Sequence, residues 1–436
     1  MSTSPSPDAP ALPATTKTGG RYAVLPRVAG RSYIPLGLMA RVPLAMLTIG
    51  VLTLVTNVSN SYAIGGFAAG AIGLGAAVGA PVGGYLADRL GQKPVLIVAA
   101  VVNALLVGAV VALAYALLPE HGAQLGDAST LALLGVALLA GGTSPQVGPL
   151  SRVRWMALSR KLPEPERGPM VDTALSLEGT ADEITFVLGP ALVGLLASLV
   201  APWLPLVLAA AMTLALVTLW AVHPTVKVVG ARPATSTSVG SVGYVSPNRP
   251  NWFLVAVPVA AMLCMGTFFG SAQTALTAFT GVHGSVDQAG LMYAIMGASS
   301  AFTALSVAYW PAKFSYPWRW VMAAALMTAG SAAFLLPTSL GQMVWVLLLA
   351  GLPVGPVMVT IFSVGSVVAP PQWMGTVMTA LASGVVAGTA LGSSLSGSLA
   401  QGSGYHVAFL VPIAAAGALF LLGLAAAAVL RGRARA

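Results

Sequence analysis

Charged side chains are scarce in this chain. Only 7% of its 436 residues are Asp, Glu, Lys or Arg, while 57% are hydrophobic. Soluble domains carry about 25% charged residues, so an ordinary water-soluble globule is excluded. Cysteine is nearly absent as well, because Cys264 is the only one. A single thiol forms no internal disulfide, which excludes a disulfide-stapled extracellular fold.

Sequence motifs of enzymes and metal sites are also missing. No phosphate-binding P-loop, zinc-protease HExxH or nucleophile elbow occurs. The four histidines do not show the spacing of metal ligands: His121, His223, His283 and His406. We therefore expect a protein that is not an enzyme, with no catalytic residue, no metal and no cofactor.

Long apolar stretches take the place of these motifs. Twelve can be read, centred near residues 45, 73, 106, 140, 187, 212, 262, 297, 328, 354, 386 and 418. A helix needs roughly 20 apolar residues to cross a hydrocarbon core. Lipid cannot satisfy exposed backbone groups, so each stretch must be helical. The sequence predicts an all-α membrane protein with twelve transmembrane helices, embedded in a lipid bilayer.

The basic residues are distributed unevenly between the connections. The net charge of +9 comes from Lys and Arg that fall before the first stretch, after the last one, and in every second connection between them. By the positive-inside rule both termini are cytoplasmic. The net positive charge therefore reflects the membrane topology of the chain, and we expect no nucleic-acid partner. In this interpretation Arg152 and Arg154 belong to a cytoplasmic loop, and Arg41 is the only basic residue inside a span.

The chain divides into two halves of six stretches. A weak repeat supports the division, because Tyr62-Ala63-Ile64 in the second stretch matches Tyr293-Ala294-Ile295 in the eighth. We predict a disordered cytoplasmic tail at 1–31, bundles at 32–223 and 251–430, a cytoplasmic linker at 224–250, and a basic tail at 431–436.

One polar segment interrupts this apolar chain, and it runs from Gly84 to Pro94 as G-Y-L-A-D-R-L-G-Q-K-P. It resembles the loop between helices 2 and 3 of the major facilitator superfamily, with Gln92 where that family usually has a basic residue. The resemblance implies two six-helix bundles with pseudo-twofold symmetry. It also implies a cytoplasmic gate that latches the outward-facing state, formed by Gly84, Asp88, Arg89, Gly91 and Lys93. Arg152, Arg154 and the start of the eleventh helix are the partners expected for Asp88.

Three carboxylates lie inside the fifth stretch: Glu178, Asp182 and Glu183. Residues four apart share a helix face, so Glu178 and Asp182 form one acidic stripe. Arg41 in the first stretch lies at a similar depth and is their expected partner. A charge in mid-membrane costs about 2.5–3.5 kcal/mol, so these groups are either a structural ion-pair network or a site for protons or a cationic substrate. Asp182 is our candidate for the deep titrating group.

Glycines mark further candidate features. Gly189-Pro190 partly resembles a helix 5 motif of drug:proton antiporters, and we predict a kink there. Stripes of glycine four residues apart occur in the second and eleventh stretches (Gly75, Gly79, Gly83 and Gly384, Gly388, Gly392). They indicate either tight helix packing or a sliding interface between bundles, and with the family resemblance we favour the interface. In the family that the chain resembles, helices 1, 4, 7 and 10 line the central cavity, which makes Gln146, Phe268, Phe269 and Gln273 candidates for the substrate cavity. The alternative for the aromatic residues is ordinary helix packing.

Together these features resemble bacterial 12-helix drug:proton antiporters, with helices like those of actinobacterial exporters. We expect a monomer in the bacterial cytoplasmic membrane that exports a small molecule by alternating access, driven by protons. Three alternatives remain open: an importer or uniporter of a polar nutrient, a lipid flippase, and a non-transporting membrane sensor or assembly subunit.

Overall fold

The computed structural model describes residues 20–118, 124, 126–229, 252–284, 288–311 and 313–433. Every regular element in these ranges is a helix. Eleven helices or helix pairs are long and apolar enough to cross a membrane. The remaining predicted span is α13 (Tyr316–Ala332) with the short turn η5 (Ala333–Leu335), which packs against α15 and α18. The predicted all-α fold of twelve transmembrane helices is confirmed.

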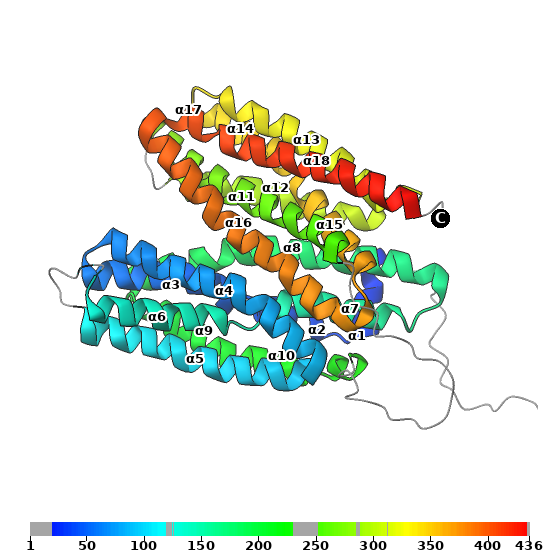
Figure 1. Cartoon of the computed structure of the whole chain (residues 1–436), viewed down its shortest axis with the longest axis horizontal. Helices are drawn as coiled ribbons and strands as arrows, with labels where there is room; N and C mark the ends of the chain where they lie inside the picture. Colours follow the sequence, from blue (N-terminus) through cyan, green and yellow to red (C-terminus); the bar gives the residue numbers. More distant parts are fainter. Residues whose placement is uncertain are drawn as a thin grey trace, which may run out of the picture.

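The described helices group into six spans in each half of the chain, and Figure 1 shows the two halves as two groups of helices. The N-terminal half contains α2 (Tyr33–Met39) with α3 (Val42–Ser59), α4 (Tyr62–Leu90), α5 (Gln92–Leu117), α6 (Ala128–Gly142) with α7 (Val147–Ser159), α8 (Glu164–Leu199), and α9 (Leu204–Met212) with η2 (Thr213–Val217) and α10 (Thr218–Val222). The C-terminal half contains α11 (Trp252–His283), α12 (Gln288–Ser306) with η4 (Val307–Tyr309), α13 with η5, α14 (Leu340–Gly351) with α15 (Val354–Val368), η6 (Pro371–Trp373) with α16 (Met374–Ser403), and α17 (Tyr405–Ala408) with α18 (Leu410–Arg433).

The ends of the chain differ from the prediction. Residues 1–19 lie outside the described ranges, but η1 (Arg21–Ala23) and α1 (Val24–Ala29) are helical. Leu25 is fully buried there, so the predicted disordered tail 1–31 is too long. Of the predicted linker 224–250, the structure describes η3 (Pro224–Val228) and residue 229. At the other end, α18 continues into the segment predicted as a tail.

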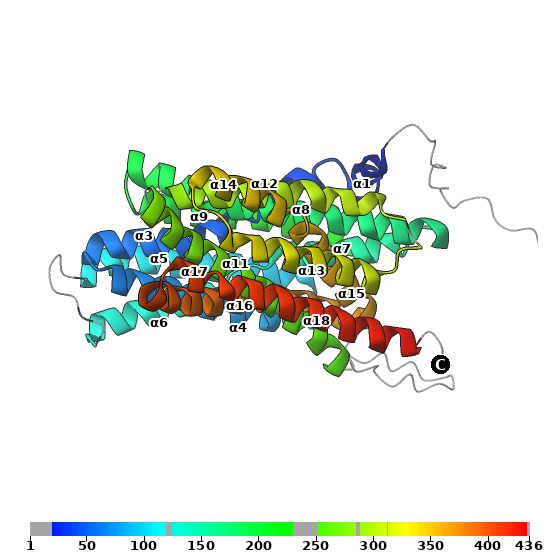
Figure 2. The same cartoon turned by 90° about the horizontal axis from the view of Figure 1, so that it is seen from above.

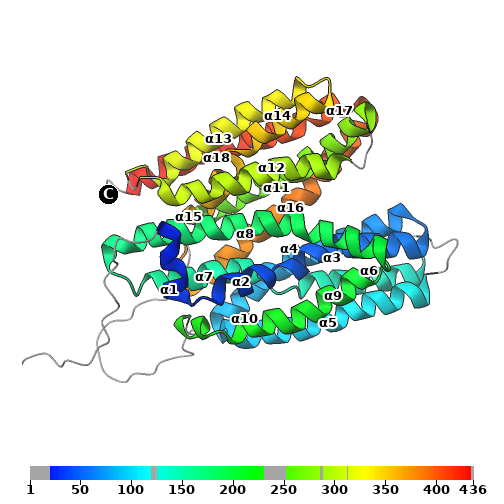
Figure 3. The same ribbon diagram turned by 180° about the vertical axis from the view of Figure 1, so that it is seen from behind.

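The two halves form two bundles that touch through a few helices. The helices run roughly along one axis (Figure 2). Contacts between the bundles join α4 to α16, α8 to α12 and α15, and α7 to α16. The bundles lie against each other near the end that carries α7 and the last turns of α18, and they diverge toward the opposite end (Figures 1 and 3). The α4–α5 and α7–α8 connections lie at the closed end.

The glycine stripes pack inside each bundle. A Cβ atom on Gly75 or Gly79 would collide with the backbone of α6, and one on Gly388 or Gly392 with the backbone of α11. The two helices that carry the stripes, α4 and α16, do meet between the bundles as predicted, but these four glycines lie on faces that pack inside each bundle. Absent side chains let the helix backbones approach closely, and here this closeness stiffens the individual bundles.

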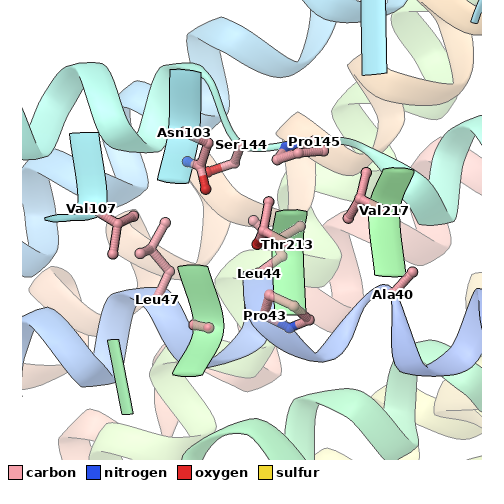
Figure 4. Close-up of a pocket in the computed structure, with 11 residues that line it drawn as sticks. Ala40, Pro43, Leu44, Leu47, Asn103, Val107, Ser144, Pro145, Thr213 and Val217 are labelled. Atoms are coloured by element: carbon pink, nitrogen blue, oxygen red, sulfur yellow. The ribbon is translucent and has the colours of Figure 1, made fainter. Parts of the chain in front are cut away.

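The fourth span is broken in mid-membrane, between the end of α6 and the start of α7. Pro145 lies in this break, and the side chains of Asn103 and Ser144 donate hydrogen bonds to Ala140 O at 2.7 and 3.1 Å. The wider π-turn η2 lies opposite, and Thr213 joins these residues around a cavity of about 10 Å³ (Figure 4). This volume is close to what one buried water needs. Because α7 continues the span, Arg152 and Arg154 lie inside it, which corrects their predicted position in a loop.

Candidate functional site

A buried network of four charged side chains lies between α3, α7 and α8. Arg41, at the start of α3, forms ion pairs with Glu178 and Asp182, and its Nη1 lies 3.2 Å from Asp182 Oδ1. Arg152 Nη2 of α7 lies 2.6 Å from Asp182 Oδ2. The charge pair expected between the first and fifth spans is thus present. Arg152 adds a second cation that sequence reasoning missed, because the break in the fourth span hid its depth.

Neutral donors complete the environment of Glu178. Its Oε1 accepts hydrogen bonds from the Ser151 hydroxyl at 2.8 Å and from Trp155 Nε1 at 2.7 Å. The Tyr33 and Ser151 hydroxyls form a further hydrogen bond of 2.8 Å. A buried carboxylate with this many partners is well satisfied, so Glu178 serves to hold α2, α7 and α8 together.

Asp182 is the most accessible member of the network. Its side chain is 18% exposed, whereas those of Arg41 and Arg152 are 6% and 1% exposed. Both arginines also have a buried Nε that finds no hydrogen-bond partner in the described part of the chain. Unpaired buried donors are costly, so the network has unused capacity for a hydrogen-bond acceptor beside its one accessible carboxylate.

The network reaches the other bundle through Arg152. The guanidinium Cζ of Arg152 lies 3.8 Å from the centre of the Phe362 ring on α15. A cation over an aromatic face is attracted by the ring quadrupole. A change in the ion pairing of Arg152 therefore alters its contact with Phe362 at the bundle interface.

Glu183 has different surroundings from the other two carboxylates. It is buried, and its Oε1 accepts a hydrogen bond of 2.9 Å from the Ser300 hydroxyl of α12, in the opposite bundle. No ion pair of Glu183 occurs among the described residues. The adjacent Thr180 hydroxyl also crosses the interface, donating to Ala301 O at 3.1 Å.

The segment resembling a gate makes a close contact between bundles. Asp88 Oδ1 accepts the backbone N–H of Gly375 at 2.9 Å. Asp88 Oδ2 accepts both the N–H and the hydroxyl of Thr376 at 2.7 Å. The carboxylate therefore caps the first turn of α16, where the helix dipole favours negative charge. This is the contact with the eleventh helix that the family resemblance implied.

Small residues allow this capping contact. A Cβ on Gly84 would lie 2.6 Å from Gly375 O, and one on Gly375 would lie 2.6 Å from Asp88 Oδ1. Beside them Arg89 lies over the Tyr85 ring at 4.7 Å. Gly91 ends α4 with φ +90°, a conformation that favours glycine. Its neighbour in the motif, Lys93, is exposed.

The two arginines expected as partners of Asp88 have other roles. Arg152 belongs to the carboxylate network described above. Arg154 binds within its own bundle, donating to Gln92 Oε1 at 2.9 Å, Trp220 O at 2.9 Å and Thr225 Oγ1 at 3.0 Å. Gln92, the departure from the family pattern, also donates to Leu150 O at 3.2 Å. The neutral Gln92 thus accepts a hydrogen bond from the cation Arg154 at the position where the family usually has a basic residue.

A second polar contact between the bundles, besides that of Asp88 with α16, was not predicted from the sequence. Arg319 Nη1 of α13 lies 3.0 Å from Asp172 Oδ2 of α8, and the Tyr316 hydroxyl donates to Asp172 Oδ1 at 2.8 Å. The partners are about 147 positions apart, so no local pattern joins them. Nearby, the Tyr22 hydroxyl donates to Leu305 O at 2.6 Å, and burial raises the pKa of Tyr22 to about 12.

The remaining predicted site residues lie in varied surroundings. α8 continues through Pro190, and Gly189 packs closely on the backbone of Ala45 in α3. Gln146 is buried at the break of the fourth span and donates to Ser144 O at 3.0 Å.

The aromatic part of the predicted cavity needs correction. Phe268 is fully buried against Phe269 and Phe334, with ring centres 6.1 and 6.4 Å away, so it packs the C-terminal bundle. Gln273 is exposed. Among the described residues, no group of three or more His, Cys, Asp or Glu side chains is placed to hold a metal.

Comparison with known proteins identifies the family of this chain. The family model of the Major Facilitator Superfamily matches residues 35–385. No curated protein sequence matches the chain.

Among solved structures, the human organic anion transporter MFSD10 (TETRAN) is 18% identical with a TM-score of 0.67, covering 90% of this chain and 99% of that one. A bacterial homologue of the iron transporter ferroportin, in an outward-facing state, is 14% identical with a TM-score of 0.64, covering 91% and 99%. The transporter FucP, in the outward conformation, is 14% identical with a TM-score of 0.59, covering 91% and 99%. At these identities the likeness shows the shared fold.

Proposed function

The chain belongs to the Major Facilitator Superfamily of membrane transporters, and from this premise we propose that it exports a small molecule in exchange for protons. The two bundles rock about the interface of α4 with α16 and of α8 with α12. Both termini are cytoplasmic in this proposal, the membrane is the bacterial cytoplasmic membrane, and the working unit is a monomer.

The buried network of Arg41, Glu178, Asp182 and Arg152 carries this proposal. Ionisable side chains inside a membrane span are expensive and usually line a transport or proton pathway. Asp182 is accessible and contacts both arginines. Protonation of Asp182 would weaken both ion pairs, and Arg152 would pass the change to Phe362 in the other bundle. A site that links charge to the bundle interface supports coupling.

The closed end of the molecule supports an outward-facing state. Asp88 caps α16, and Asp172 binds Arg319 and Tyr316, at the end where the basic connections lie. The positive-inside rule assigns this end to the cytoplasm. The similar ferroportin homologue and FucP were solved in outward-facing conformations.

A transport experiment tests the proposal. Everted membrane vesicles containing the chain are energised with a proton gradient, and a pH-sensitive dye reports proton loss as each compound of a small-molecule library is added. We expect wild-type vesicles to lose protons with some compounds and vesicles containing Asp182→Asn to lose none. Comparable expression and gel-filtration profiles establish that the variant folds. Full activity of Asp182→Asn would contradict the proposal.

Metabolite profiling identifies the direction and the alternatives. Cells that overproduce the wild type are compared with cells that produce Asp88→Ala, in which the cap of α16 is lost. A compound enriched in the medium supports export, whereas accumulation inside the cells supports an importer. No change in soluble compounds, together with altered lipid distribution, supports a flippase. No transported compound of any kind supports a sensor or assembly subunit.

A further inference from the structure

The three carboxylates of α8 divide into two classes. Glu178 and Asp182 face two cations, Arg41 and Arg152, so the four charges balance. Glu183 lies one position beyond Asp182, and its partner among the described residues is the neutral hydroxyl of Ser300. An ionised carboxylate that is buried without a cation is strongly destabilising, and such a group binds a proton instead.

Glu183 lies where the bundles press together. On one side of it, a Cβ on Gly179 would lie 2.8 Å from Val359 Cγ2 of α15. On the other, a Cβ on Gly297 of α12 would lie 3.4 Å from Val187 Cγ2 and 3.9 Å from Glu183 Oε2. Glu183 is thus buried where α8 packs closely on α12 and α15 of the other bundle.

The titratable groups around Glu183 leave it without a cation. On α12 the only one is Tyr293, which is close enough to interact with it electrostatically. α9 and α15 contain no titratable side chain, and η4 contributes Tyr309. Asp182 precedes it on α8. The arginines at the start of α3 and on α7 are turned toward Glu178, Asp182 and Gln92.

We propose that Glu183 is a separate proton-binding site that locks α8 against α12. A proton on Glu183 removes the charge that the closed interface cannot accommodate. Loss of that proton leaves a charge that favours hydrated, separated helices. Proton occupancy therefore biases the conformational equilibrium by its differential affinity for the two states. This inference rests on the proposed rocking motion and adds to it a lock distinct from the Asp182 network.

The test measures the position of the bundles as a function of pH. Spin labels are placed on Arg160→Cys in the N-terminal half and Lys313→Cys in the C-terminal half, two exposed positions near the closed end, in a Cys264→Ala background. Electron–electron distances give the ratio of closed to open molecules without any substrate. In the wild type this ratio rises on acidification, by about tenfold per pH unit for each linked proton.

Glu183→Gln keeps the size of the side chain and removes the titration. We expect the pH dependence of the closed-to-open ratio in this variant to correspond to one linked proton fewer than in the wild type. The closed state should also persist at high pH. The matched control is Glu164→Gln, since Glu164 lies on the same helix with its side chain 88% exposed, and its slope should equal that of the wild type. An unchanged slope in Glu183→Gln overturns the proposal.

Two further readouts keep the result interpretable. Infrared spectroscopy of the wild type should show the carbonyl stretch of a protonated carboxylic acid that Glu183→Gln removes, and absence of this difference overturns the proposal.

Should Glu183→Gln fail to fold, Ser300→Ala serves instead. It removes the donor that favours the ionised form, so the midpoint of the distance change should move to higher pH; an unmoved midpoint overturns the lock. Transport in the vesicle assay is independent of these signals, so failure of the lock and failure of the proposed transport are distinguishable.

Discussion

The N-terminal and C-terminal bundles have the same architecture and different chemistry. The N-terminal bundle buries Arg41, Arg152 and Arg154 together with Glu178 and Glu183 of α8, and Asp182 lies beside them with its side chain 18% exposed. The C-terminal half of the sequence, from residue 252 onward, contains a single acidic residue, Asp287, which lies outside the described ranges. Its helices are held by close packing, with α16 seated on α11 through glycines.

Under the proposed function, this difference gives the two halves different parts in the transport cycle. In that proposal, charge that responds to protons belongs to the N-terminal bundle. The C-terminal bundle offers the neutral Ser300 hydroxyl, the Phe362 ring and the first turn of α16, together with the cation Arg319, which pairs with Asp172. Without a carboxylate among its described residues, the C-terminal bundle offers fewer sites for protons than the N-terminal bundle.

The largest effect is expected from breaking the buried network. Arg41→Met leaves Glu178 as a buried carboxylate without its cation, and loss of one partner of a buried pair typically costs about 3–5 kcal/mol. Thermal unfolding in detergent, followed by gel filtration, measures this loss. The double variant Arg41→Met/Glu178→Leu should regain part of the stability, because no orphan charge remains. Equal stability of Arg41→Met and the wild type would show that the network is not needed for folding.

The next largest effect is expected from introducing a charge at Gln92, the neutral residue beside Arg154 in the N-terminal bundle. Gln92→Arg restores the residue that the family usually has, but places a second cation beside Arg154. We expect a loss of about 2–3 kcal/mol from an unsatisfied buried group, measured as a lower midpoint of thermal unfolding. Adding Arg154→Gln should reverse part of it. A stable Gln92→Arg protein would show that Arg154 tolerates a neighbouring cation.

A glycine of the C-terminal bundle gives the corresponding test of close packing. In Gly388→Ala the new methyl group meets the backbone at Leu263 and Thr267, and overpacking typically costs about 1–3 kcal/mol. Gly83→Ala on α4 is the matched control, because no atom lies within 4 Å of the added carbon. Thermal unfolding should separate the two variants, and equal unfolding midpoints would argue against tight packing as the basis of the C-terminal bundle.

The smallest change in folding stability is expected at the contact between bundles. Asp88→Asn keeps the shape of the cap on α16 but removes its charge. We expect the closed state to lose about 1–2 kcal/mol relative to the open state, which changes the closed-to-open ratio by roughly 5- to 30-fold. The open population therefore rises, while the midpoint of thermal unfolding is nearly unchanged. The labelled pair at Arg160→Cys and Lys313→Cys measures this shift. A closed population equal to that of the wild type would mean that other contacts hold the bundles together.

Composition and hydropathy were sufficient to predict the helical membrane fold and its division into two halves. The acidic stripe of Glu178 and Asp182 and its pairing with Arg41 were also predictable, because helix geometry fixes which residues share a face. The depth of Arg152 was not, since the break at Pro145 looks like the end of a span and α7 looks like a polar loop. The packing of the glycine stripes was misjudged because a periodic pattern defines a face without naming the helix that covers it.

Long-range pairing was beyond sequence reasoning for a similar reason. Asp172 and Arg319 belong to different bundles, and neither lies in a motif. Phe268 was predicted to line the cavity from its helix alone, but the side chain turns toward Phe334. Contacts such as these depend on how the bundles and helices are rotated, which a single sequence does not encode locally.

The hydrogen bond between Gln92 and Arg154 has a consequence for how such sequences diverge. The two positions share one positive charge, which resides on α7 in this chain. If an ancestor carried the charge at position 92, substitutions had to occur in a preferred order. A chain that first gained a second arginine would pass through an intermediate with two neighbouring buried cations, which is less stable than one with a single cation at this site. Descendants are therefore expected to change these positions as a pair, so that neither residue can be interpreted without the other.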